Sequence, residues 1–331
     1  MKKIVKKIIP YSALVFAISV VNQAQTLLVS IFKLWDIASS KEFKNIYMEQ
    51  VSQYTNSNLT IDQQYIMPEW QHNLDVIDNY FKSNFSFNFL RHHVIGATMF
   101  IGTIYSWKNN QLAYLEKIYP KSTLKKILKE ISVGSPMIAD LKYRTSSNSI
   151  HHLYHLAKFS IEAKVPLESI QTIIEFGAGY GNLIRIFKKI NPDSTCILID
   201  LPVFSFIQSV YLKTVFGKTN VNVIIDKKTQ IKRGAINIIP FNLDILNNLS
   251  SEKPDLFLST WALSETTSTM QKEIKSLNYF NATYLLMAYQ QADKNFKYAE
   301  DVAQIGASYR KIYNKETEYM RNNYYLFSIK S

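Results

Sequence analysis

The chain has 331 residues, more than most single domains hold, so we expect two folded units. A hydrophobic content of 47% supports a core, and the single cysteine, Cys196, excludes intrachain disulfides. The net charge of +12 would suit nucleic acid, a membrane surface or an anionic substrate, but the chain has no arginine-rich run and no aromatic RNA-binding signature. We therefore expect a solvated basic surface and no nucleic-acid partner.

The first segment, residues 1–40, is basic at its start and then hydrophobic. Four lysines precede an uncharged run from Ile8 to Phe32. This pattern fits a secretory signal, a membrane anchor or a helix lying on the membrane surface. Polar residues dilute the second half of the run, and Pro10 disturbs its start.

Residues 41–165 show the spacing of amphipathic helices, and no strand pattern competes with it. Apolar residues recur at helical intervals in Gln71–Phe81 and again in Leu112–Ile131, where Pro120 interrupts the pattern. The segment from Phe85 to Tyr105 is rich in aromatic and apolar residues. We predict a mostly helical region that covers the mouth of a following sheet.

A polar cluster at residues 145–156 leads into another helix. His151 and His155 are four residues apart and share one face, whereas His152 points elsewhere. The pair has no acidic partner, so we expect no metal site there, and we leave open whether the histidines pack or contact a substrate. Asn148 fits either a substrate contact or a helix cap.

The segment from Ile170 to Pro202 predicts a strand, a glycine loop, a helix and a second strand. Gly177, Gly179 and Gly181 alternate in the loop, where glycine lets the backbone turn tightly and approach a ligand. Asp200 ends the second strand about 20 residues later, at the position from which a carboxylate binds ribose hydroxyls in nucleotide-binding folds.

The alternation of helices and strands continues to the end of the chain. Expected helices are Phe204–Phe216, Met270–Leu277 and Phe296–Tyr313, and expected strands are Leu256–Ser259, Tyr284–Ala288 and Tyr324–Ile329. Either Val221–Ile225 or Ile236–Ile239 is expected to be the third sheet strand. The class is therefore α/β, in a second unit that we place at residues 166–331.

A resemblance to a known superfamily rests on the glycine loop. Glu175 stands two residues before Gly177, and the pattern E-x-G-x-G-x-G resembles the first motif of the class I S-adenosylmethionine (SAM) methyltransferases. The resemblance implies a Rossmann-like fold, with a mainly parallel seven-stranded sheet and helices on both faces. It also implies SAM as the cofactor.

Three pieces resemble more narrowly the bacterial family of sugar O-methyltransferases. The first is the loop EFGAGYG with Asp200-Leu201-Pro202 and a following helix that contains Gln208 and Tyr211-Leu212. The second is the pair Ser264-Glu265, and the third is residues 133–136 with the segment 145–156. The resemblance covers roughly residues 89–331. It implies methyl transfer to a hydroxyl of a glycan or nucleotide sugar, with a general base that removes the hydroxyl proton.

The resemblance implies roles for individual residues. Those expected to bind the cofactor are Glu175, Gly177, Ala178, Gly179, Gly181, Asp200, Leu201, Asn242 and Asp244. Those expected to act as the base are Glu265, His151 and His152, and those expected to contact the acceptor are Asn148, Trp261 and Ser264. Because SAM is a cytoplasmic metabolite, we favour a cytoplasmic protein whose first segment lies on the inner face of the membrane.

Other functions stay open. The acceptor could be a lipid, polyketide or phenolic hydroxyl, which the abundance of Tyr (21) and Phe (19) permits. An RNA methyltransferase would use the basic charge, and an inactive membrane-associated scaffold would have lost SAM binding. The sequence leaves the oligomeric state open.

Overall fold

The computed structural model describes residues 37–57, 59–99 and 107–331. The predicted hydrophobic run Ile8–Phe32 lies outside these residues. Within the described part of the chain, no helix is both long enough and apolar enough to cross a membrane.

The centre of the molecule is an eight-stranded sheet in the order β5-β6-β4-β3-β7-β8-β10-β9. The strands are β3 (Thr172–Phe176), β4 (Thr195–Asp200), β5 (Val221–Val223), β6 (Ile236–Pro240), β7 (Leu256–Thr260), β8 (Tyr284–Gln290), β9 (Tyr309–Glu316) and β10 (Asn323–Lys330). Neighbours are parallel, except that β10 runs antiparallel to both β8 and β9. The strand order reverses beside β3, where the neighbouring strand passes from β4 to β7, and this is where α/β sheets bind ligands.

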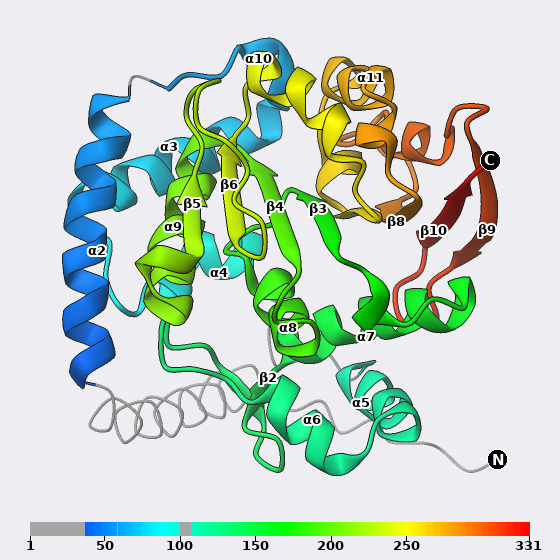
Figure 1. Cartoon of the computed structure of the whole chain (residues 1–331), viewed down its shortest axis with the longest axis horizontal. Coiled ribbons are helices and arrows are strands. Elements are labelled where there is room, and N and C mark those ends of the chain that lie inside the picture. The colour runs from blue at the N-terminus through cyan, green and yellow to red at the C-terminus, as the bar shows by residue number, and fades with distance from the viewer. Residues whose placement is uncertain (1–36, 58, 100–106) are drawn as a thin grey trace, which may run out of the picture.

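Each central strand is buried on both faces because consecutive side chains enter two different cores. Ile173 packs in one core with the helices α7 to α9, and Ile174 packs in the other with α10 and α11. The helices that flank the sheet are α7 (Ser147–Ala163), α8 (Asn182–Ile190), α9 (Pro202–Phe216), α10 (Leu243–Leu246) and α11 (Ser268–Ser276). Figure 1 shows this fan of strands, with α10 and α11 at the top of the view and α8 below the strands.

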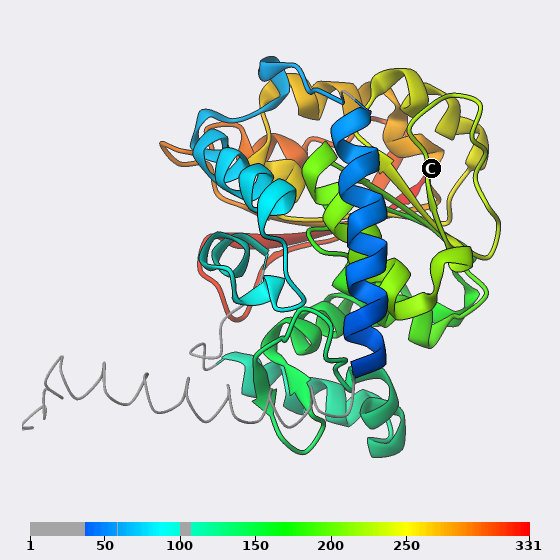
Figure 2. The ribbon, with the colours of Figure 1, turned by 90° about the vertical axis from the view of Figure 1, so that its left-hand side faces the viewer.

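The region before the sheet is mostly helical, as predicted. It contains α2 (Ile37–Asn56), α3 (Pro68–Ser83), α4 (His93–Met99), α5 (Trp107–Ile118) and α6 (Lys121–Leu128), followed by the short strands β1 (Ile138–Asp140) and β2 (Thr145–Ser146). Helix α2 lies along α9, and Ser209 of α9 hydrogen-bonds to Gln50 of α2 in their buried contact. Figure 2 shows α2 running along the molecule, with α5 and α6 grouped at one end.

The α/β class and the mainly parallel sheet are confirmed, with one strand more than the predicted seven. Both candidates for the third strand are in the sheet: Ile236–Pro240 pairs with β4, and Val221–Val223 adds an edge strand beyond it. The hairpin of β1 and β2 was also absent from the prediction.

The helix predicted at Phe296–Tyr313 is wrong. A short 3-10 turn, Ala299–Ala303, is followed by β9, which pairs along its length with β10. The helical spacing of apolar residues there is weak, and backbone pairing with a neighbouring strand overrides it. Such pairing depends on residues that are distant in sequence, so a local hydrophobic pattern does not predict it.

Candidate active site

A cavity of about 610 Å³ lies at the carboxyl ends of the central strands. Its floor includes Phe176, Asp200 and Thr260, which end β3, β4 and β7. Its other walls come from the region before the sheet, including Trp70 at the start of α3 and Met99 at the end of α4. The reversal in strand order and the cavity therefore coincide.

The glycine loop lies between β3 and α8 and forms part of the cavity wall. Gly177, Gly179 and Gly181 all have positive φ angles, of 75°, 58° and 87°. A Cβ on Gly177 would lie 2.0 Å from the Cβ of Ala262. Both the packing and the backbone conformation therefore favour glycine at this position. Gly181 packs in the same way against Leu212, outside the cavity lining.

Replacing Gly177 by alanine is expected to lower the free energy of unfolding by about 1–3 kcal/mol, because the new methyl group meets Ala262. The double variant Gly177→Ala with Ala262→Gly removes that collision and should recover part of the loss. About 1 kcal/mol should remain from the positive φ angle. Urea unfolding of the three proteins measures both parts, and equal stability of the single variant and the parent would contradict the packing argument.

Two carboxyl groups flank the glycine loop. Asp200 Oδ2 accepts hydrogen bonds from the Gly179 amide at 3.1 Å and from Gln208 Nε2 at 2.8 Å, and its Oδ1 accepts one from the Leu201 amide at 2.8 Å. Burial raises the pKa of Asp200 to about 7, although these hydrogen bonds act to lower it. Burial, with the nearby Asp200 charge, raises the pKa of Glu175 to about 8.

Glu175 carries an unsatisfied oxygen at the cavity. Its side chain is 2% exposed, and its Oε2 has no hydrogen-bond partner among the described residues. A buried carboxyl oxygen without a hydrogen-bond partner is costly, and a donor or cation on a ligand would relieve that cost. The cavity lining includes Glu175 and Asp200 together.

Glu265 lies in the 3-10 turn Ala262–Glu265 after β7 and lines the cavity. The first residue of this turn, Ala262, packs against the glycine loop at Gly177. Burial raises the pKa of its carboxyl to about 7. Trp261 has a φ angle of 62°, and its Nε1 donates to Asn323 Oδ1 at 2.6 Å, which fixes the indole against the cavity. Ser264 does not line it, because its Oγ is held 2.6 Å from the Trp261 carbonyl and 2.7 Å from Gln290 Oε1.

All three histidines of α7 line the cavity. His151 stacks on Trp261 with ring centroids 5.5 Å apart, and its Nδ1 contacts Gln111. His155 Nδ1 is hydrogen-bonded to the Tyr325 hydroxyl. Burial lowers the pKa of each ring, that of His152 to about 3, so the rings are neutral at pH 7. No group of three or more His, Cys, Asp or Glu among residues 37–57, 59–99 and 107–331 could hold a metal ion.

Asn242 and Asp244 lie apart from the cavity lining. Asn242 caps α10 by accepting from the Asp244 amide at 2.9 Å, and the exposed Asp244 carboxylate pairs with Lys227 at 3.2 Å. Phe241, one residue earlier, lines the cavity instead, since it directly follows the carboxyl end of β6.

No model of a known protein family matches the chain, and no curated protein matches it. Among solved structures, an O-methyltransferase family protein from Burkholderia thailandensis matches with 14% identity and a TM-score of 0.37, over 58% of this chain and 60% of that one. The mitomycin 7-O-methyltransferase MmcR matches with 9% identity and a TM-score of 0.34, over 56% of this chain and 57% of that one. This chain therefore spans less than two thirds of either protein.

A third match covers more of both chains. The protein MtNAS, in complex with MTA and tNA, is 12% identical with a TM-score of 0.39, over 88% of this chain and 97% of that one. These identities and TM-scores are too low to assign an activity to this chain.

Several residues of the cavity were not among the sequence candidates. Gln208 lies outside the lining but donates to Asp200 from within α9, and a glutamine in a mostly apolar helix is the signal that marks it. Tyr65, Trp70 and Met99 come from the helical region and carry no such signal, because their approach to the sheet is a matter of tertiary structure.

Proposed function

We propose that the protein is a SAM-dependent methyltransferase that transfers a methyl group to a hydroxyl oxygen. The observation that carries the proposal is one arrangement: a glycine loop at the switch point of the sheet, with Glu175 on one side and Asp200 on the other, both facing one cavity. The volume of about 610 Å³ has room for a cofactor and a small acceptor together.

The residues present fit SAM. The unsatisfied Oε2 of Glu175 would accept from the ammonium group at the methionine end, directly or through water, and Asp200 would accept from the ribose hydroxyls. Phe241 and Leu201, which line the cavity, would pack on the adenine, whereas Asn242 and Asp244 are outside the lining. When bound, SAM supplies an electrophilic methyl group on a positively charged sulfur.

Glu265 is the base that we propose. A hydroxyl is a poor nucleophile until its proton is removed. A carboxyl whose pKa is about 7 is partly ionised at neutral pH, and its carboxylate form binds a proton more tightly than an ordinary glutamate does. Glu265 faces the same cavity as the glycine loop, so it would take the proton from an acceptor held between them. Trp261 would form one wall for that acceptor.

The acceptor that we propose is a sugar hydroxyl, as the resemblance implies, with a phenolic hydroxyl as the second candidate. Rings on the cavity wall suit both, since they pack on the apolar face of a sugar and on a planar aromatic acceptor. The abundance of these rings favours the phenol; they include Tyr65, Trp70, Phe204, Phe241, Trp261 and Phe296. A panel of nucleotide sugars, glycans and phenols assayed for methyl transfer distinguishes the two.

The helical region 41–165 would serve as a cap that completes the acceptor site. Tyr65, Trp70 and Asn148 reach the cavity from it. The proposal that residues 1–40 contact a membrane surface rests on their sequence alone. A vesicle flotation assay with the full chain would test that contact.

Calorimetry with SAM and S-adenosylhomocysteine tests the cofactor assignment. We expect Asp200→Ala to weaken binding by at least tenfold, about 1.4 kcal/mol, because the ribose loses its acceptor. Asp244→Ala is the matched control, and its exposed carboxylate should leave binding unchanged. Failure of the folded parent to bind either compound would remove the methyltransferase proposal, and weakening by Asp244→Ala would restore its predicted adenine contact.

A further inference from the structure

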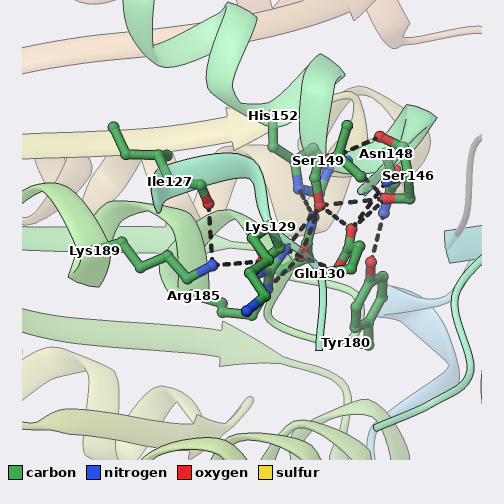
Figure 3. A network of polar contacts seen from close by, with 12 residues as sticks. Ile127, Lys129, Glu130, Ser146, Asn148, Ser149, His152, Tyr180, Arg185 and Lys189 are labelled. Carbon is green, nitrogen blue, oxygen red and sulfur yellow. Dashed lines mark hydrogen bonds and ion pairs between the residues drawn. The ribbon is translucent and has the colours of Figure 1, made fainter. Parts of the chain in front are cut away.

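A buried network of polar groups joins α7, α8 and the segment after α6 (Figure 3). At its base, Glu130 Oε2 lies 3.0 Å from Nη2 of Arg185, with side chains 4% and 0% exposed. The second Glu130 oxygen accepts hydrogen bonds from the hydroxyls of Ser146 and Ser149. A carboxylate only accepts and a guanidinium only donates, so these two groups set the direction of every bond built on them.

Asn182, the first residue of α8, takes its orientation from Arg185. The Nε of Arg185 donates to an Asn182 side-chain atom at 2.8 Å, and that atom must be the oxygen Oδ1 because the guanidinium has no acceptor. The amide nitrogen therefore faces the other way. It donates to Ser149 Oγ at 3.3 Å and to His152 Nδ1 at 3.1 Å.

Ser149 cannot reverse this direction. Its hydroxyl proton goes to Glu130, and its oxygen accepts from Arg185 Nη2 at 2.7 Å as well as from Asn182. Both hydrogens of the Asn182 amide are then used, one on Ser149 and one on His152. The hydrogen bonds can therefore have one direction only: Arg185 donates to Asn182, and Asn182 donates to the imidazole of His152.

We infer that Asn182 and Arg185 are positioning residues that hold His152 as the neutral tautomer with its proton on Nε2, so that it donates a hydrogen bond to a ligand oxygen and does not act as a base. An imidazole whose Nδ1 accepts from an amide carries its proton on Nε2. Burial and the nearby Arg185 charge keep the pKa of the ring low, which agrees with the neutral state. His152 lines the cavity, so the donor serves what binds there.

The inference rests on the proposed function for the identity of the ligand oxygen. That oxygen belongs either to the carboxylate at the methionine end of the cofactor or to the acceptor. In both cases His152 contributes a neutral hydrogen-bond donor. His152 is then no longer a candidate for the general base, which strengthens the assignment of that role to Glu265.

Nitrogen-15 NMR of the histidine-labelled full chain reads the tautomer without any ligand, so it stands whether or not the protein binds SAM. The His152 signal is identified by its loss in His152→Gln. We expect the couplings of an Nε2–H imidazole that stays neutral from pH 6 to pH 8. A proton on Nδ1, or a ring that titrates in this range, would overturn the inference.

Asn182→Asp is the variant that tests the positioning role. Its carboxylate still accepts from Arg185 but can only accept from His152, so the proton should move to Nδ1 and the pKa of the ring should rise. Asn182→Ser retains a hydroxyl donor and should keep more of the Nε2–H form than Asn182→Asp. An unchanged tautomer in Asn182→Asp would contradict the role of Asn182, provided that circular dichroism shows the variant folded.

Binding measurements identify the ligand oxygen. If it is the cofactor carboxylate, His152→Ala should weaken S-adenosylhomocysteine binding about tenfold, and His152→Gln, which restores an N–H donor, about threefold. Methylthioadenosine, which lacks the carboxylate, should bind His152→Ala and the parent equally. If S-adenosylhomocysteine binding is unaffected, the oxygen is the acceptor's, and His152→Ala should raise the KM for the acceptor about tenfold. No change in either quantity would overturn the donor role.

Discussion

Replacing Glu130 by alanine is expected to lower the free energy of unfolding by about 3–5 kcal/mol, the largest single loss of stability that we predict. The change leaves Arg185 fully buried without a counter-charge and removes the acceptor for two serine hydroxyls. Urea or guanidinium unfolding followed by circular dichroism measures the loss.

Two further variants separate the buried charge from a general effect of truncation. The double variant Glu130→Ala with Arg185→Met removes both charges and should regain most of the stability, since the uncompensated guanidinium is gone. Glu49→Ala breaks the exposed pair with Lys218, 2.6 Å in length, and should cost less than about 1 kcal/mol. If Glu130→Ala loses no more free energy of unfolding than Glu49→Ala, the buried pair contributes no more to stability than an exposed pair does.

Replacing Glu265 by glutamine is expected to lower kcat for methyl transfer by about 10²–10⁴-fold with little change in SAM binding. The amide keeps the shape of the side chain and cannot take a proton. Because burial raises the pKa of Glu265 to about 7, the carboxyl holds its proton below that pH and is a competent base above it. The rate of the parent should therefore rise through pH 7 to a plateau, and that rise should be absent in the variant.

Glu273→Gln is the matched control, because Glu273 belongs to α11 and lies outside the cavity lining. It should leave the rate and its pH dependence unchanged. Loss of fold is a poor explanation for a slow Glu265→Gln. Burial raises the pKa of Glu265 from 4.5 to about 7, so the stability that goes with the protonated carboxyl is lost as the pH rises from about 4.5 to about 7. At pH 8 that loss is complete in the parent, and the variant should be at least as stable. A parent-like rate in Glu265→Gln would move the base elsewhere.

The part of the site that could be predicted from the sequence is the part encoded locally. The strand, the glycine loop, α8 and Asp200 follow one another in the chain, and their spacing alone indicates a ligand site at a sheet end. Spacing is less informative one strand away. Asn242 is the second residue after β6, and its side chain caps α10 outside the cavity lining.

The orientation of His152 had no local signal at all. It depends on Arg185, which looks in sequence like an ordinary basic residue of an amphipathic helix, and on Glu130 from a different part of the chain. Likewise, no local pattern predicts that β9 forms a strand and pairs with β10. These features arise only when distant segments meet, which periodicity and motif spacing do not describe.

The two edges of the sheet bear on how the protein behaves at high concentration. One edge, β5, has only three residues, and the other, β9, carries the exposed charged residues Arg310, Lys311, Lys315 and Glu316. Short or charged edge strands are poor templates for pairing with a strand from another molecule. The short and charged edge strands therefore disfavour edge-to-edge aggregation at both ends of the sheet, although its central strands are mostly apolar.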